Sequence, residues 1–312
     1  MPNYMIILNP VSGRGRGARL EPVIRKSLET HQLDFDLQMT EKREQAIELA
    51  RQAAKDGYKV VVAAGGDGTS NEVLNGLMLA AQANEGHSAM GFICVGQGND
   101  YAYGVSVEPD VEKNVEILAK DHRNWIDVGF SIGGDYPEGR YFGNGVGIGF
   151  DAVVGFEALK LKPLHGFVSY LIAALKTIFL FHRGPHVRIE YSNEVLEQQA
   201  LMVSVMNGRR LGGGFMMAPE GEIDDGQFDL SIVDQVKRGR IATLIPYFIK
   251  GTHATQVEVH TDRTNRIVVT ALEGKIPAHA DGETLCTAGE KLILEILPKK
   301  LEVVCPEVGT PS

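Results

Sequence analysis

The chain has 312 residues, of which 44% are hydrophobic and 23% charged, a composition typical of a soluble globular protein with one large or two ordinary domains. Its formal net charge of −9 argues against a general nucleic-acid binder, which needs a basic surface, so no nucleic-acid partner is expected. Three cysteines without a Cys-x-x-Cys pair indicate a reducing compartment and no structural zinc.

The first part of the chain alternates strand and helix patterns. Apolar runs predict four strands, at 5–8, 34–39, 60–64 and 91–95. Helical periodicity predicts three helices between them, over about 19–31, 43–56 and 70–83. This order predicts a parallel sheet covered by helices, with ligands bound beyond the carboxyl ends of its strands.

Three glycine-containing loops follow strands of this sheet, at 9–17, 65–69 and 96–100. Glycine lets backbone N–H groups approach a phosphate closely, and the helix starting near Ser70 would point its positive end into the same space. Asp67 adds a carboxylate suited to a metal or a hydroxyl proton. Each loop alone can be an ordinary strand–helix connector, whereas together the three predict a nucleotide site where they converge.

From about Trp125 the pattern changes to short β-like runs separated by turn residues. Such spacing predicts an antiparallel β-sandwich or barrel. Two helical insertions interrupt it, at about 151–181 and 239–250.

We therefore predict two domains. The first is a nucleotide-binding α/β domain with a parallel sheet, over 1–128, which the C-terminal segment 299–312 is expected to join. The second, over 129–298, is a β-rich domain for the substrate and a metal.

Two acidic turns in the second part carry candidate chemical groups. The turn 222–227 holds three carboxylates of the kind that bind Mg²⁺, although local chemistry alone favours an Asx turn between strands. Asp281-Gly282-Glu283 places a carboxylate on a tight turn, either as a general base or simply as part of a hairpin. The histidines are scattered at spacings that form no metal site.

The apolar segment 164–181 is shorter than the roughly 20 residues of a membrane-spanning helix, so no transmembrane helix is predicted. A helix that is apolar on nearly all sides is usually buried. It can be a core helix or one wall of an acyl-chain cleft, and both readings stay open. In the second reading, anionic headgroups would meet Lys160, Lys162, Lys176 and Arg183.

Six motifs occur in a fixed order: Asn9-Pro-x-Ser-Gly13, Gly65-Gly-Asp-Gly-Thr-x-Asn-Glu72, Gly98-Asn-Asp-Tyr-Ala102, Asn144-x-x-Gly-x-Gly-Phe-Asp151, Asp224-Asp-Gly226 and Asp281-Gly-Glu283. This ordered set, spread over nearly the whole chain, resembles the diacylglycerol kinase catalytic-domain family in its soluble bacterial lipid kinase branch, to which sphingosine kinases are related. The Gly-Gly-Asp-Gly-Thr core alone is shared with NAD kinases. The Asp-Asp-Gly and Asp-Gly-Glu motifs favour the lipid kinases.

The resemblance implies a two-domain protein with ATP between its domains, which uses ATP and Mg²⁺ to phosphorylate a lipid hydroxyl, most simply that of diacylglycerol or a related glycerolipid. It places the proton-accepting carboxylate at Glu283, with Asp67 orienting the phosphates or a catalytic Mg²⁺. Gln97 stands where the family usually has threonine. Carried over by position, the ATP contacts are Asn9, Pro10, Ser12, Gly13, Thr40, Gly65, Gly66, Asp67, Gly68, Thr69, Ser70, Asn71 and Gln97.

The same resemblance implies a Mg²⁺ ion on the acidic turn of the second domain. Asp225 would bind it, and Glu222 and Gln227 would supply flanking contacts. Asp127 matches an aspartate tied to this metal network.

Two other functions remain open: an NAD kinase-like phosphotransferase acting on a soluble substrate, and a non-catalytic, nucleotide-gated lipid-binding protein. The N-terminus lacks the basic and apolar regions of a signal peptide, so a cytoplasmic protein is expected. Its lipid substrate implies transient, peripheral contact with the inner face of the membrane. The oligomeric state, a homodimer included, is open.

Overall fold

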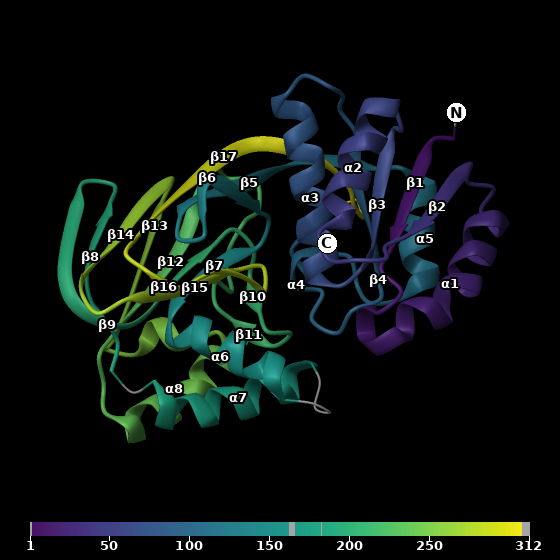
Figure 1. Cartoon of the computed structure of the whole chain (residues 1–312). Coiled ribbons are helices and arrows are strands. Elements are labelled where there is room, and N and C mark those ends of the chain that lie inside the picture. The colour runs from purple at the N-terminus through teal and green to yellow at the C-terminus, as the bar shows by residue number, and fades with distance from the viewer. Residues whose placement is uncertain (1, 162–165, 182, 308–312) are drawn as a thin grey trace. The chain divides into compact units, whose positions relative to one another are not determined.

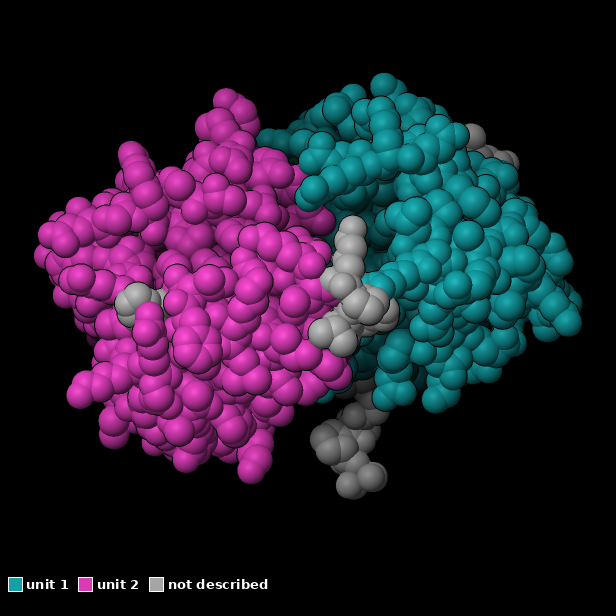
Figure 2. Space-filling view, turned by 60° about the horizontal axis from the view of Figure 1, so that its bottom comes forward, with its two compact units in different colours: residues 1–126, 299–312 teal, residues 127–298 magenta. Residues whose placement is uncertain are grey.

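Figure 1 shows the structure, a computed structural model that describes residues 2–161, 166–181 and 183–307. It divides into two compact units, coloured separately in Figure 2: residues 1–126 with 299–312, and residues 127–298. The chain changes unit between Ile126 and Asp127, close to the expected boundary at 128.

The first unit is built on a parallel sheet with the strand order β17-β4-β3-β1-β2. Its strands are β1 (Tyr4–Leu8), β2 (Phe35–Met39), β3 (Val60–Gly65), β4 (Ala89–Cys94) and the last residues of β17 (Lys291–Val304). The two central strands β3 and β4 are buried along their whole length, as expected of a parallel sheet covered on both faces.

Helices cover both faces of this sheet. They are α1 (Ser12–Thr30), α2 (Gln45–Asp56), α3 (Asp67–Gln82), α4 (Asp100–Gly104) and α5 (Val111–Lys120). Side chains of α1 and α5 share a core with Ile6, Leu8 and Val62. Because side chains alternate along a strand, the intervening residues face the other side, where α2 and α3 pack together.

Two helices begin earlier than the sequence predicts. Helix α3 starts at Asp67, so only Gly66 separates the end of β3 from its first turn. Helix α1 is recorded from Ser12 but is interrupted by three left-handed residues, Gly13, Arg14 and Gly15, with φ of 54°, 60° and 75°. Glycine adopts this conformation without steric cost, and part of the glycine loop predicted at 9–17 is thus a left-handed turn within the first residues of the helix.

The second unit is a mainly antiparallel β-sandwich. Its strands are β5 (Arg123–Gly133), β6 (Tyr136–Phe142), β7 (Gly145–Gly149), β8 (His186–Tyr191), β9 (Glu194–Met206), β10 (Arg210–Leu211), β11 (Phe215–Met216), β12 (Phe228–Asp234), β13 (Val259–Thr264), β14 (Arg266–Glu273), β15 (Ile276–Ala280), β16 (Glu283–Gly289) and the first part of β17. This confirms the predicted fold class.

Strand β9 takes part in both layers of the sandwich. Its first part, 194–199, pairs with β8, which continues to β14 and β17. Its last part, 202–206, pairs with β7 on one side and with β12 on the other. The core between the layers combines residues of both, such as Ile189 and Val269 from one and Val203 and Phe228 from the other.

Three helices pack together against the strands of the second unit, as Figure 1 shows: α6 (Phe150–Lys160), α7 (Gly166–Leu180) and α8 (Arg238–Lys250). A short 3₁₀ helix, η1 (His253–Thr255), follows α8. The predicted insertion at 151–181 thus contains two helices, and Lys162 lies outside the described residues. Across the described parts of the chain, every helix is too short or too polar to cross a membrane.

Candidate active site

The three glycine loops meet at the carboxyl edge of the parallel sheet in the first unit. A Cβ placed on Gly66 would lie 3.1 Å from Cα of Gly96 and 3.6 Å from Oγ of Ser12. Asn9 links two of the loops directly, because its Nδ2 donates to Oγ1 of Thr69 over 3.0 Å. The convergence predicted from the positions of the loops is therefore confirmed.

Glycine is required at the closest point of this convergence. A Cβ on Gly96 would lie 2.4 Å from Cα of Gly66, and one on Gly13 would lie 2.6 Å from the carbonyl oxygen of Val95. Side chains at these positions would force the loops apart. Without them, backbone groups of all three loops line one small region next to the N-terminus of α3, an arrangement that suits an anion.

Asp67 points from the first turn of α3 toward the third loop. The backbone N–H of Tyr101 donates to its Oδ1 over 3.2 Å, and a Cβ on Gly98 would lie 2.6 Å from its Oδ2. The helix N-terminus favours the ionised carboxylate. Carboxylate oxygens are preferred ligands of Mg²⁺, so Asp67 fits a magnesium ion that accompanies a nucleotide.

The other predicted ATP residues lie at or next to the same edge, and several also hold the loops in place. Thr69, Ser70 and Asn71 are buried, and Nδ2 of Asn75 donates to the carbonyl oxygen of Asn71 over 2.8 Å. Thr40 follows β2, and its N–H donates to the carbonyl of Leu8 over 2.9 Å. The remaining predicted ATP residues belong to the three loops: Asn9, Pro10, Ser12 and Gly13 to the first, Gly65, Gly66 and Gly68 to the second, and the exposed Gln97 to the third.

Glu72, the last residue of the second motif, has a structural role that the sequence analysis missed. Its carboxylate accepts the backbone N–H groups of Glu44 and Ala46, over 3.0 and 3.1 Å, and so caps the N-terminus of α2. Helix α2 has no side-chain cap of its own at this end. No Ser, Thr, Asp or Asn stands directly before α2 at the capping position, which is Glu44. This was the available signal that a residue from elsewhere in the chain supplies the cap.

In the second unit, Asp281 and Glu283 lie on the hairpin between β15 and β16, where Ala280 pairs with Glu283. Asp281 and Gly282 both have positive φ, 49° and 82°, as the turn of a tight hairpin requires. Asp281 is buried and accepts three backbone N–H groups, from Gly143, Asn144 and Gly145, over 2.8 to 3.0 Å. Asp281 thus anchors the turn and fixes the half-buried Glu283 beside it.

Asn207 joins the acidic hairpin and Asp127 into one buried network, which the sequence analysis also missed. Its Nδ2 donates to the carbonyl of Asp127 over 3.0 Å and to that of Gly143 over 2.8 Å. Asn144 in turn donates through Nδ2 to the carbonyl of Arg210 over 2.9 Å. An asparagine after an apolar strand gives no sequence signal for such distant partners.

The predicted metal turn, 222–227, is held by protein groups. The N–H of Gly226 donates to Oδ2 of Asp127 over 2.6 Å, and that of Gln227 donates to Oδ1 of Asp225 over 2.9 Å. Asp225 Oδ2 faces the guanidinium of Arg263 at 3.4 Å. Glu222 and Gln227 are exposed.

Arg263 also pairs with Asp229, over 3.0 Å, and this neighbour was not foreseen from the sequence. The carboxylates of Asp229, Asp225 and Glu222 raise the pKa of Arg263, whereas burial raises the pKa of Asp229. Within the described residues, no three His, Cys, Asp or Glu side chains are arranged as a metal site. The carboxylate of Asp225 thus faces a guanidinium of the protein itself.

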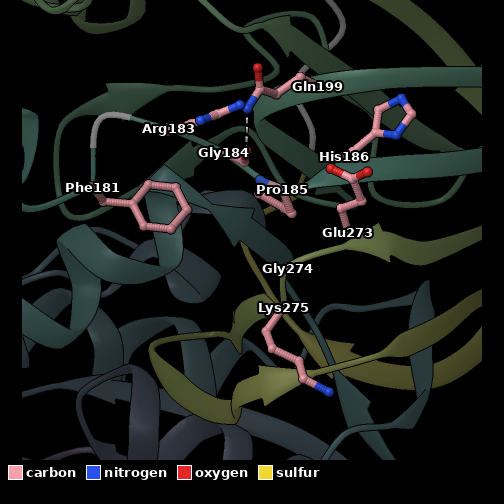
Figure 3. A pocket seen from close by; sticks show the side chains of 9 residues that line it. All are labelled: Phe181, Arg183, Gly184, Pro185, His186, Gln199, Glu273, Gly274 and Lys275. Carbon is pink, nitrogen blue, oxygen red and sulfur yellow. Dashed lines mark hydrogen bonds between the residues drawn. The ribbon is translucent and has the colours of Figure 1, made fainter.

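Figure 3 shows a separate hollow of about 560 Å³ in the second unit, after the end of α7. Its lining comes from the segment after α7, from β8, from β9, from Glu273 at the end of β14 and from the following turn with Lys275. Nε2 of Gln199 donates to the carbonyl of Gly184 over 2.9 Å. None of the predicted catalytic, nucleotide or metal residues lines this hollow, but Arg183 does.

Comparisons with known proteins point in one direction. Residues 3–131 match the model of the diacylglycerol kinase catalytic domain, and residues 144–305 match that of the YegS C-terminal NAD kinase beta sandwich-like domain. A diacylglycerol kinase of Staphylococcus saprophyticus is 29% identical over 98% of this chain and 95% of its own. One of Staphylococcus aureus is 28% identical over 89% of this chain and 85% of its own.

Solved structures give the same fold at lower identity. A diacylglycerol kinase from Bacillus anthracis superimposes with a TM-score of 0.69 at 19% identity, covering 98% of this chain and 97% of that one. An NAD kinase from Archaeoglobus fulgidus in complex with ATP gives a TM-score of 0.54 at 12% identity, over 97% and 94% of the two chains.

Proposed function

This chain belongs to the diacylglycerol kinase catalytic-domain family and is a kinase for an alcohol acceptor, and from this premise we propose that it transfers the γ-phosphate of ATP, with Mg²⁺, to a lipid hydroxyl. Diacylglycerol or a related glycerolipid is the proposed acceptor. The convergence of three glycine loops next to Asp67 carries the proposal, because such an edge offers backbone N–H groups and a carboxylate to a magnesium nucleotide.

In the proposed reaction the protein mainly positions groups and neutralises charge, as phosphoryl transfer requires. Asp67 would hold the Mg²⁺ that accompanies the nucleotide, and this ion would neutralise part of the phosphate charge. Glu283 accepts the proton of the lipid hydroxyl while the hydroxyl oxygen attacks the γ-phosphorus. The bond to the β,γ-bridging oxygen breaks, and ADP leaves with that electron pair. Asp281 keeps Glu283 in place through its three backbone hydrogen bonds.

A substrate panel tests this function. We expect the purified protein, given radiolabelled ATP and Mg²⁺, to label diacylglycerol in a lipid extract and to leave NAD unlabelled. Mass spectrometry of the product identifies the lipid. Labelled NAD phosphate would favour the NAD kinase-like alternative. Binding of ATP and lipid without any phosphorylated product would contradict the kinase assignment and favour a nucleotide-gated lipid-binding protein.

Helix α7 carries an exposed apolar stripe that suits contact with a membrane. One side of α7, formed by Phe167, Tyr170, Leu171, Ala174 and Ile178, faces the protein, where Ala174 and Ile178 are buried. Another side of the helix carries an exposed apolar stripe, and its most exposed member is Phe179, at 72%. This stripe consists of Val168, Ile172, Leu175 and Phe179.

Basic side chains were predicted beside this helix, and two of them, Lys160 and Lys176, form ion pairs within the protein. Lys160 and Lys176 pair with the buried Glu157 over 2.6 and 2.7 Å, which lowers the pKa of that carboxyl and leaves one net positive charge. Arg183 is exposed beyond the end of α7. We propose that this cytoplasmic protein docks transiently through the stripe on the anionic inner face of the membrane, where its lipid substrate lies.

The double substitution Leu175→Asp with Phe179→Asp is expected to weaken binding to phosphatidylglycerol vesicles at least about tenfold, because burying one such side chain is worth roughly 1.5–3 kcal/mol. Cosedimentation measures this binding. Val195→Asp, which places the same charge on an exposed apolar site of β9, is the control and should bind as the wild type does. Unchanged binding by the double variant would exclude α7 as the docking surface.

A further inference from the structure

Carboxylates at the acidic turn 222–227 and on the strand after it are paired with a positively charged side chain of the protein, that of Arg263. Arg263 lies on β13, directly opposite Asp229 of β12 in the strand pairing. Its Nε contacts Oδ1 of Asp229 at 3.0 Å, and its Nη1 contacts Oδ2 of Asp225 at 3.4 Å. One guanidinium therefore bridges two carboxylates that come from the turn and from the strand following it. Such forked pairing suits arginine, which stays charged at any physiological pH.

The rest of the turn is also closed by the protein. Asp127 forms two hydrogen bonds with the turn: its N–H donates to the carbonyl of Ile223 over 2.8 Å, and its Oδ2 accepts the N–H of Gly226 over 2.6 Å. Nε of Arg209 donates to the carbonyl of Gly221 over 2.7 Å. The Asp225 carboxylate is thus oriented on one oxygen by the backbone and on the other by Arg263.

A divalent ion at Asp225 would have to share a carboxylate with this guanidinium. Mg²⁺ needs near-octahedral oxygen coordination, and its charge would repel the neighbouring guanidinium. We propose that Arg263 takes the place of a structural divalent cation at turn 222–227, so that this chain holds the turn in shape without bound metal. Magnesium is then required only with the nucleotide, in the first unit.

Thermal unfolding of the full chain without nucleotide tests this. After treatment with EDTA, the wild type should have the same Tm with and without MgCl₂. Arg263→Ala should unfold roughly 2–4 °C lower without Mg²⁺ and regain at least half of the loss when MgCl₂ is added. Arg266→Ala is the matched control, because it removes an exposed arginine–glutamate pair away from the turn and should gain nothing from Mg²⁺.

Two results would overturn the proposal. One is a wild-type Tm that rises by several degrees with Mg²⁺ and loses this rise in Asp225→Asn. The other is an Arg263→Ala protein that shows no response to Mg²⁺. If Arg263→Ala does not fold, Mn²⁺ titration followed by electron paramagnetic resonance tests the same point without that variant. A tight Mn²⁺ site in the wild type that is absent from Asp225→Asn would then overturn the proposal. Stability without nucleotide is independent of phosphoryl transfer, so failure here leaves the proposed kinase activity untouched.

Discussion

Glu283→Gln is expected to lower kcat for lipid phosphorylation by roughly 10²–10⁴-fold, the usual contribution of a general base. Glutamine has nearly the same shape as glutamate, but its amide does not accept the proton of the attacking hydroxyl. The hairpin should survive, because its anchor is the neighbouring Asp281 with its three backbone hydrogen bonds. Steady-state incorporation of labelled phosphate into lipid measures the loss, and Tm of the same preparation reports the fold.

Two comparisons separate chemistry from other causes. Glu290→Gln removes an exposed carboxylate at the far end of β16, where it pairs with Lys275, and should keep wild-type turnover. Affinity for a non-hydrolysable ATP analogue should be unchanged in Glu283→Gln, because every predicted ATP contact belongs to the first unit. Near-normal turnover in Glu283→Gln would remove this residue from the mechanism.

Asp67→Asn is expected to lower kcat/KM for MgATP by roughly 10²–10³-fold, the scale reported for the loss of one charge-stabilising group. Asparagine keeps an oxygen for the N–H of Tyr101, so the turn should hold, but the charge that orients magnesium and phosphates is lost. Part of the activity should return at raised Mg²⁺ concentration, since weaker metal binding is offset by mass action. Initial rates over a matrix of ATP and Mg²⁺ concentrations measure both effects.

Asp110→Asn is the matched control for Asp67→Asn. Asp110 is also an aspartate at a helix N-terminus of the first unit, where it caps α5 by accepting the N–H of Lys113 over 3.1 Å. Asparagine caps helices as well as aspartate does, so this variant should behave like the wild type. If Asp67→Asn showed wild-type rates with the usual Mg²⁺ dependence, Asp67 would have no role with the magnesium nucleotide.

The sheet and the converging loops of the first unit could be predicted because local sequence determines them. The buried runs of β3 and β4 are continuous apolar stretches, and glycines mark the points where loops approach within van der Waals contact. The left-handed run at 13–15 escaped prediction because glycines allow many turn conformations and the sequence alone does not choose among them.

The sequence analysis mainly missed contacts between side chains and groups that lie far apart in the sequence. Glu72 caps a helix that starts 27 residues earlier, Arg263 meets an aspartate 38 residues away, and Asn207 reaches the carbonyl of Asp127 across 80 residues. Such pairs depend on how strands are ordered in the fold, which periodicity does not reveal. Metal binding and an Asx turn were both open for Asp225 in the sequence, and in the structure its carboxylate accepts the N–H of Gln227 and faces the guanidinium of Arg263.

Strand β9 has a consequence for how the second unit comes apart. Its first part is hydrogen-bonded into one layer and its last part into the other, within a single uninterrupted strand of 13 residues. Because one strand joins the two layers and their side chains share one core, the sandwich should lose its structure cooperatively, in one transition. A protease that cuts within this strand would deprive both layers of a central member at once, and no fragment with a single intact layer should accumulate.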